Sequence, residues 1–252
     1  AYKFFGNQLR NGFELLGEIL GQEPNYTKMK EHISIENEVN QYKLEIFDLI
    51  RAIPSPIDNL FNAVSAATTI LLSGTRENLN FYKEMRDIAK IRYNQGKHYA
   101  TEERIRSIWP YMLTFFDISL CEWLDRELGL SILFDIFNYN FSDPIEINGK
   151  NLFYGMAKKT MNFPMTKQST ELYYPFIEDC VNMAKDFNAD CFIYTSSIAC
   201  KQFGSVPKIL KEALMEEVGL PMLIIELDVG DARITSIKTI KNKIKMFVET
   251  LM

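Results

Sequence analysis

The part of the chain after about Arg104 alternates short apolar runs with amphipathic stretches, and this pattern restricts the possible fold more than any other feature. The runs are continuously apolar, as is typical of strands covered on both faces. They occupy 108–115, 131–137, 191–195 and 221–227, and stretches with an apolar stripe at helical spacing occupy 119–128, 172–187, 206–218 and 235–251. Strands that alternate with helices form parallel βαβ units. The sequence therefore predicts an α/β fold with a doubly wound, mainly parallel four-stranded sheet.

The part before this point predicts helices. From 26 to 99 the apolar residues recur at steps of three and four, the period of one helix face. Pro54 and Pro56 interrupt the pattern, because proline lacks a backbone donor and restricts the residue before it. Ser73-Gly74-Thr75 marks a second break. We therefore predict a helical region, 1–103, followed by a Rossmann-like α/β domain, 104–252.

Charge and hydropathy exclude two kinds of partner. The 28 basic and 33 acidic residues leave a net charge of −5, which gives no long-range attraction to nucleic acid or to anionic lipid. No apolar run approaches the roughly 18 residues that a membrane span needs. We expect a cytoplasmic protein that binds neither nucleic acid nor membrane.

The cysteines and histidines limit the possible chemistry. A chain of this size does not need disulfides, and no two of the four cysteines have CxxC spacing. Cys121, Cys180 and Cys191 lie on apolar stretches and are predicted to be core residues. His32 and His98 have charged neighbours and are expected at the surface, so catalytic triads and two-histidine metal sites lack the necessary residues.

Ligands of open parallel sheets bind at the carboxyl ends of the strands. This rule directs attention to 116–117, 138–140, 196–200 and 228–233. Cys200 is the most specific residue there, because it follows a buried strand, precedes a helix and adjoins the positive charge of Lys201. Its thiolate could face a metal or a substrate, or Cys200 could be an ordinary, partly buried cysteine.

Charged residues near the C-terminus also allow two interpretations. Asp228, Asp231 and Arg233 follow the last predicted strand, where they could contact a ligand or could pair with one another and cap the next helix. The final helix carries a basic stripe that forms a solvated face or suits the phosphates of a CoA ester, at Lys238, Lys241, Lys243 and Lys245.

Five segments taken together resemble a known family. They are RIRSIWPY at 104–111, GMAK at 155–158, ACKQF at 199–203, GLPMLIIELDVGDAR at 219–233 and KIKMFVE at 243–249. In order and spacing they resemble the C-terminal part of 2-hydroxyacyl-CoA dehydratase and benzoyl-CoA reductase subunits, with ACK more similar to the α-type subunit. The helical stretch 36–56 also resembles the segment that precedes this domain in the family.

The resemblance implies an oxygen-sensitive iron–sulfur 2-hydroxyacyl-CoA dehydratase, found in anaerobes, that acts through a ketyl radical. Cys200 would be one of three cysteine ligands of a 4Fe–4S cluster, whose remaining ligands are not identifiable in this chain. The implied partners are a homologous second subunit, an ATP-dependent iron–sulfur activator and an acyl-CoA substrate. With the acyl-CoA near the loop 196–200, the candidate substrate-binding residues are Ser196, Ser197 and Lys201.

Two alternatives remain. The chain could belong to an aromatic acyl-CoA reductase of the benzoyl-CoA type, or it could be a cluster-less, non-catalytic relative that serves as a binding or partner subunit. Ala199 stands where the family often has serine, and Lys243 where arginine is common. A single cysteine cannot retain a four-iron cluster.

Overall fold

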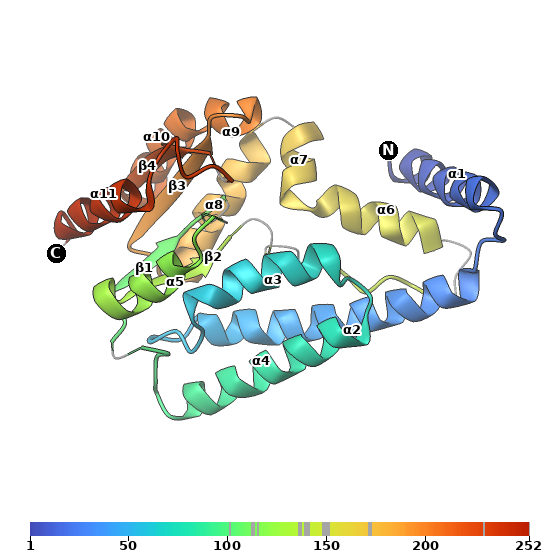
Figure 1. Ribbon diagram of the computed structural model, residues 1–252, viewed down its shortest axis with the longest axis horizontal. Coiled ribbons are helices and arrows are strands. Elements are labelled where there is room, and N and C mark those ends of the chain that lie inside the picture. The colour runs from blue at the N-terminus through green and yellow to red at the C-terminus, as the bar shows by residue number, and fades with distance from the viewer. Residues whose placement is uncertain are drawn as a thin grey trace.

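The computed structural model describes residues 1–100, 102–111, 114, 116–135, 138, 142–147, 152–170, 173–228 and 230–251. The molecule is elongated (Figure 1). The sheet and its helices lie at one end, and helices α1 and α6 lie at the other.

The first part of the chain is helical, as predicted. Its elements are α1 (Tyr2–Leu20), α2 (Tyr26–Ile50), α3 (Asn59–Leu71) and α4 (Arg76–Asn94). The breaks between α2 and α3 and between α3 and α4 fall at the predicted proline and Ser-Gly-Thr segments. Asn25, Asp58 and Thr75 cap α2, α3 and α4, because each side chain accepts a hydrogen bond from a first-turn backbone N–H.

The sheet has four parallel strands in the order β2-β1-β3-β4, which confirms the predicted α/β class. They are β1 (Ile105–Ile108), β2 (Leu130–Phe134), β3 (Cys191–Ser197) and β4 (Met222–Leu227). The predicted position of the first strand is wrong. β1 ends at Ile108, whereas the sequence predicts a strand that begins there. Pro110 has no N–H to continue the pairing. β2 ends at Phe134, and parts of both predicted runs, at 112–113, 115 and 136–137, lie outside the described residues.

Helices cover both faces of the sheet, and most of them agree with the predicted stretches. They are α5 (Ser119–Trp123), which continues into a π-helix, η1 (Leu124–Leu128), then α8 (Tyr174–Asp186), α9 (Lys201–Ser205), α10 (Pro207–Val218) and α11 (Ile237–Glu249). Three helices lie outside the predicted stretches: the short α9, α6 (Leu152–Asn162) and α7 (Pro164–Thr170).

Alternate residues of β3 face two apolar clusters, as the two-residue period of a strand requires. Phe192 and Tyr194 join the cluster with α2, α8 and α10, whereas Cys191 and Ile193 join the cluster with α5 and α11. Cys121, Cys180 and Cys191 are buried, which confirms their predicted core positions.

Two asparagines of α3 pair with the outer edge of β2. Asn59 Nδ2 donates to the carbonyl of Leu130 (2.7 Å), and Asn59 Oδ1 accepts from the N–H of Ile132 (2.5 Å). Asn62 Nδ2 donates to the carbonyl of Ile132 (2.7 Å). These amides occupy the positions that a neighbouring strand would take, and they fix α3 against the sheet.

Arg106 of β1 connects the sheet to two helix ends. Its guanidinium donates to the carbonyls of Ile50 and Ala52 at the end of α2 and to Phe187 after α8. It also pairs with Glu103 at 2.7 Å, and both side chains are almost fully buried. A buried charge is tolerated here because it is paired and hydrogen bonded.

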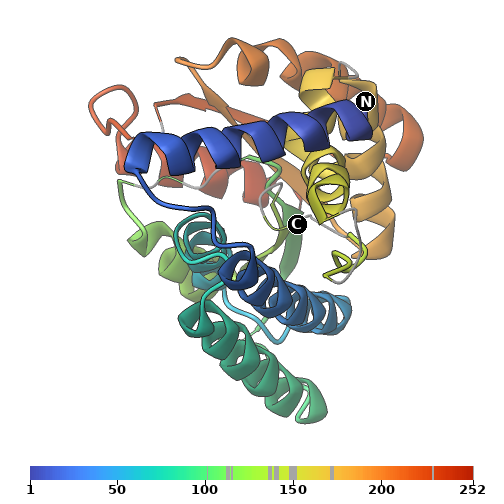
Figure 2. The same ribbon diagram turned by 90° about the vertical axis from the view of Figure 1, so that its right-hand side faces the viewer.

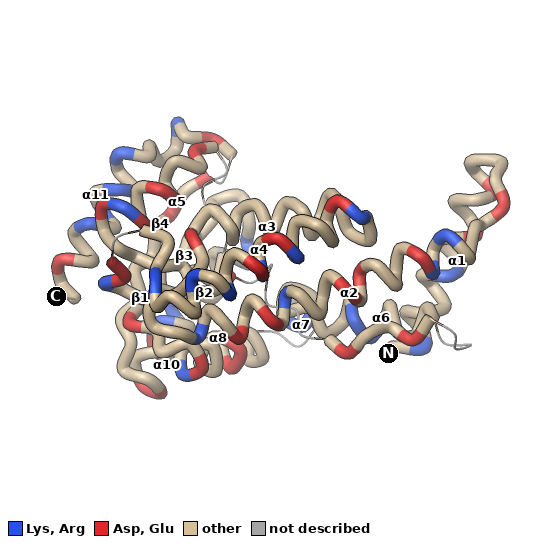
Figure 3. Tube along the Cα trace, turned by 90° about the horizontal axis from the view of Figure 1, so that it is seen from below, with Lys and Arg blue, Asp and Glu red and all other residues tan. Residues whose placement is uncertain are grey.

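Helix α1 packs against α6, far from it in sequence (Figure 2). A Cβ at Gly6 would lie 3.0 Å from the carbonyl oxygen of Phe153, so the two backbones approach closely there. Basic and acidic residues are interspersed along the helices (Figure 3). Among the described residues, no helix is both long and apolar enough to cross a membrane.

Candidate functional site

The strand order places a topological switch point between β1 and β3, since the connections after these strands run in opposite directions. Aromatic side chains pack around the carboxyl ends of these two strands. Trp109 Nε1 donates to Thr195 Oγ1 (3.1 Å), and Tyr111 meets Tyr194 edge to face with ring centres 4.9 Å apart. Burial, together with Tyr111, raises the pKa of Tyr194 far above its ordinary value. Tyr194 therefore stays neutral and acts only through hydrogen bonding and packing.

Cys200 lies at this end of the sheet, in the position that the sequence predicts. It is the residue before α9, and its side chain does not cap that helix. It is half-buried and packs against the cluster that contains Tyr194. The other three thiols are buried, and burial raises the pKa of Cys121 and of Cys191 to about 12. Cys200 is therefore the cysteine best placed to meet a metal or a ligand.

The candidate substrate-binding residues differ in their settings. β3 extends through Ser196 and Ser197, so both serines belong to the strand and not to the following loop, and both are buried. As neighbours in a strand, they point to opposite faces of the sheet. Lys201 is exposed on the first turn of α9. Only one of the two serine side chains can face the same ligand as Lys201.

The polar side chains of the other predicted segments make local structural contacts where they are described. Asp117 Oδ1 accepts from the backbone N–H and the hydroxyl of Ser119 (3.0 and 2.6 Å). Asn138 bonds with Asp135 and Ser65 in a buried network, and 139–140 lie outside the described residues.

Asp231 pairs with Arg233, whose hydrogen bonds lower the pKa of the aspartate. Asp228 Oδ1 accepts from the backbone N–H groups of Gly230 and Asp231. The pairing interpretation is therefore confirmed for Asp231 and Arg233, whereas Asp228 bonds to backbone N–H groups. The cap of α11 is a different residue, Ser236.

The two histidines have different environments. His32 is exposed, as expected, and its Nδ1 donates to the carbonyl of Gly74 (2.7 Å). The prediction for His98 is wrong: its side chain is 2% exposed. Its Nδ1 donates to the carbonyl of Ser55 (2.7 Å), in the proline-containing turn after α2, and this hydrogen bond holds the ring in the protein interior.

The described residues do not fit a complete metal site. Within them, no three His, Cys, Asp or Glu side chains are grouped so that they could hold a metal ion. Cys200 can supply one thiolate to an iron–sulfur cluster, but such a cluster needs about four ligands. The remaining ligands would have to come from residues beyond those described.

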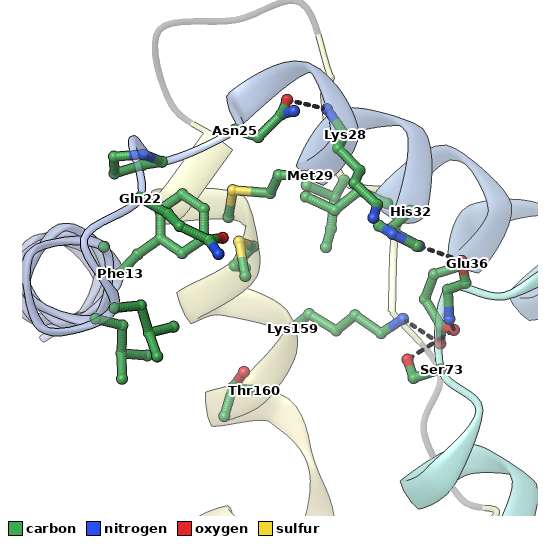
Figure 4. Close-up of a pocket in the computed structure, with 18 of the residues that line it drawn as sticks. Phe13, Gln22, Asn25, Lys28, Met29, His32, Glu36, Ser73, Lys159 and Thr160 are labelled. Carbon is green, nitrogen blue, oxygen red and sulfur yellow. Dashed lines mark hydrogen bonds and ion pairs between the residues drawn. The ribbon is translucent and has the colours of Figure 1, made fainter.

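A cavity of about 760 Å³ lies away from the sheet, between α1, α2, α6 and the turn that joins α3 to α4 (Figure 4). Each helix contributes residues at steps of three and four, which is one helix face. These are Phe13, Leu16, Gly17 and Leu20 of α1, Lys28, Met29, His32, Ile33 and Glu36 of α2, and Met156, Lys159 and Thr160 of α6.

One end of this cavity is polar. Glu36 accepts from Lys159 through Oε1 (3.1 Å) and from the Ser73 hydroxyl and the Gly74 N–H through Oε2 (3.0 and 3.2 Å). Burial favours a higher pKa for Glu36, but the charges of Lys159 and Lys43 and the hydrogen bonds from Lys159 and Ser73 outweigh it and lower the pKa. Glu36 is therefore ionised, and both of its carboxylate oxygens accept hydrogen bonds.

The sequence reasoning missed this cavity. Lys28, His32 and Glu36 lie four residues apart, beside Met29 and Ile33, which is a mixed stripe on a single helix face. That spacing was a usable signal on α2. The opposing walls come from α1 and α6, whose positions depend on contacts between distant parts of the chain.

The sequence model of one protein family, described as 2-hydroxyglutaryl-CoA dehydratase, D-component, matches residues 1–251. A search among curated proteins gave no match. The family match includes the five segments and the N-terminal helices, and it confirms the resemblance seen in the sequence. The chain belongs to the 2-hydroxyglutaryl-CoA dehydratase D-component family.

Proposed function

We propose that this chain is a subunit of a complex that eliminates water from 2-hydroxyacyl-CoA thioesters. The family match over residues 1–251 carries this proposal. In the overall reaction the hydroxyl at C2 and a hydrogen at C3 leave as water, and a C2–C3 double bond forms. The net reaction is redox-neutral.

The contribution of this chain centres on the switch point. Cys200 is half-buried at the carboxyl end of β3, whereas Cys121, Cys180 and Cys191 are enclosed in the core. We assign Cys200 the role of one cluster ligand, with the other ligands supplied from outside the described residues. The exposed ammonium group of Lys201 stands beside it, where positive charge suits a thioester oxygen or a CoA phosphate.

The proposal includes two protein partners. A homologous second subunit completes the dehydratase, and an ATP-dependent iron–sulfur activator starts its one-electron chemistry. The family match, which describes one component of a dehydratase, supports the second subunit. The activator is proposed from the resemblance seen in the sequence.

The test uses the complex purified under strict anaerobiosis after expression with its genomic neighbours. Iron, acid-labile sulfide, the electron paramagnetic resonance spectrum and dehydration of 2-hydroxyglutaryl-CoA are measured for the wild type, Cys200→Ala and Cys121→Ala. We expect Cys200→Ala to lose iron and dehydration, and Cys121→Ala, which removes a core thiol, to keep both.

Each alternative function predicts a different outcome of this experiment. Retention of iron by Cys200→Ala would exclude Cys200 as a ligand. Reduction of benzoyl-CoA in place of dehydration would favour the aromatic reductase. A wild-type complex that assembles without iron would favour the cluster-less partner subunit.

A further inference from the structure

We propose that the cavity between α1, α2 and α6 binds a molecule with an apolar body and a single carboxylate head group. None of the described residues that line this cavity belongs to the loops after β1 or β3. The proposed site is separate from the Cys200 end of the sheet and does not rest on the dehydratase proposal.

The size and lining of the cavity suit an apolar body. Its volume of about 760 Å³ falls within the range of small-molecule pockets, roughly 300–1,000 Å³. Leu16 and Leu20 line it and yet are 57% and 67% exposed. Side chains of this kind are normally removed from water by packing. An apolar ligand would cover them.

The charged residues at the polar end of the cavity determine which head group of a ligand can bind there. Glu36 is balanced by Lys159, and both of its oxygens already accept hydrogen bonds. Lys28 is exposed, and in Figure 4 its side chain extends along α2 toward His32. A ligand therefore meets an additional positive charge at Lys28.

His32 lies next to that charge. Its Nδ1 donates to the carbonyl of Gly74, so Nε2 of the singly protonated ring is an acceptor, and the donor to a carboxylate is Lys28. The other acid in the lining, Glu23, is exposed on the turn between α1 and α2. Among the described lining residues, Lys28 is the one lysine outside the Glu36–Lys159 pair, and Glu23 adds a second acid. This balance favours a head group with a single negative charge over one with several phosphates.

The test is isothermal titration calorimetry of the purified chain with decanoate, decanol and decanoyl-CoA. The matched variants are Lys28→Met and Lys30→Met, since Lys30 is an exposed lysine of the same helix that does not line the cavity. We expect Lys28→Met to weaken decanoate binding about tenfold or more, which corresponds to about 1.4 kcal/mol. Lys30→Met should bind decanoate as the wild type does, and decanol should bind the wild type and Lys28→Met equally.

A second variant locates the apolar body. Leu16→Trp fills space in the cavity from an exposed position on α1, and circular dichroism checks that it folds. We expect it to abolish the binding of decanoate and of decanol. The proposal is overturned if decanoate does not bind the wild type, if both lysine variants weaken it equally, or if Leu16→Trp binds normally. Binding of decanoyl-CoA without binding of decanoate would also overturn it, because the thioester has no free carboxylate.

Discussion

The Nε2 atom of His98 lies 4.0 Å from Oδ1 of Asp125, and both side chains are buried. Within the described part of the chain, neither atom has a hydrogen-bond partner. The other polar atom of each side chain is occupied, since Asp125 Oδ2 accepts from the N–H of Asn59 and His98 Nδ1 donates to Ser55. Burial raises the pKa of Asp125 to about 7, although the Asn59 hydrogen bond opposes the shift.

This raised pKa predicts how stability depends on pH. Between about 4, the ordinary pKa of an aspartate, and about 7, the folded state binds a proton that the unfolded state has released. The free energy of unfolding should therefore fall as pH rises through this window. Asp125→Asn, which does not titrate, should remove that part of the slope and unfold at a higher temperature than the wild type at pH 8. Thermal denaturation from pH 5 to 8 tests this.

The control for this experiment is Asp48→Asn, because the side chain of Asp48 is 75% exposed. It should leave the pH profile close to that of the wild type. A profile for Asp125→Asn parallel to that of the wild type would show that Asp125 does not titrate in this window.

Removal of Arg106 should destabilise the fold strongly. In Arg106→Met the almost fully buried carboxylate of Glu103 loses its partner, and the carbonyls of Ile50 and Phe187 lose a donor. We expect a loss of about 3–5 kcal/mol in urea unfolding. The double variant with Glu103→Gln should lose less, because no unpaired charge remains. Arg104→Met removes an exposed pair and should cost about 0–1 kcal/mol.

The same substitution at two glycines of α1 should have opposite effects. Nothing lies within 4 Å of a Cβ at Gly12, so Gly12→Ala should stabilise the chain by about 0.5–1 kcal/mol through its helix propensity. A Cβ at Gly6 would meet the backbone of Phe153 at 3.0 Å. Gly6→Ala should loosen α1 from α6, seen as faster hydrogen exchange in α1. Equal protection in both variants would contradict the α1–α6 contact.

Thiol labelling distinguishes Cys200 from the other cysteines. With iodoacetamide under native conditions, the half-buried Cys200 should react well before the three buried thiols, for two of which burial raises the pKa to about 12. Mass spectrometry of peptides identifies the labelled residue. Early labelling of Cys121 or Cys191 would mean that the core opens readily.

The alternation of apolar runs and amphipathic stretches was sufficient to predict the parallel sheet and most of its helices. It failed at β1, where Arg106 and Ser107 lie in a fully buried strand. The buried charge of Arg106 is satisfied by Glu103 and by carbonyls from α2 and the end of α8. Such partners are distant in sequence, and no local pattern identifies them. The same reason explains why His98 was expected at the surface.

The two candidate sites could be predicted to different extents. Cys200 was found because the end of a buried strand is a local feature, and the sheet order then placed it near the switch point. To predict the cavity, one would have to know of α6, which was not predicted, and of the close contact between α1 and α6 at Gly6. A cavity is a property of the space between elements, so it appears only when these are placed in three dimensions.

The asparagine pairs along β2 make the solubility of the sheet depend on the helical region. A fragment that began at residue 104 would keep all four strands but would lose Asn59 and Asn62. The carbonyls of Leu130 and Ile132 and the N–H of Ile132 would then be open to pairing with a strand from another molecule. The protein protects this edge with a helix that comes earlier in the chain, so the risk of aggregation lies in separating the two parts.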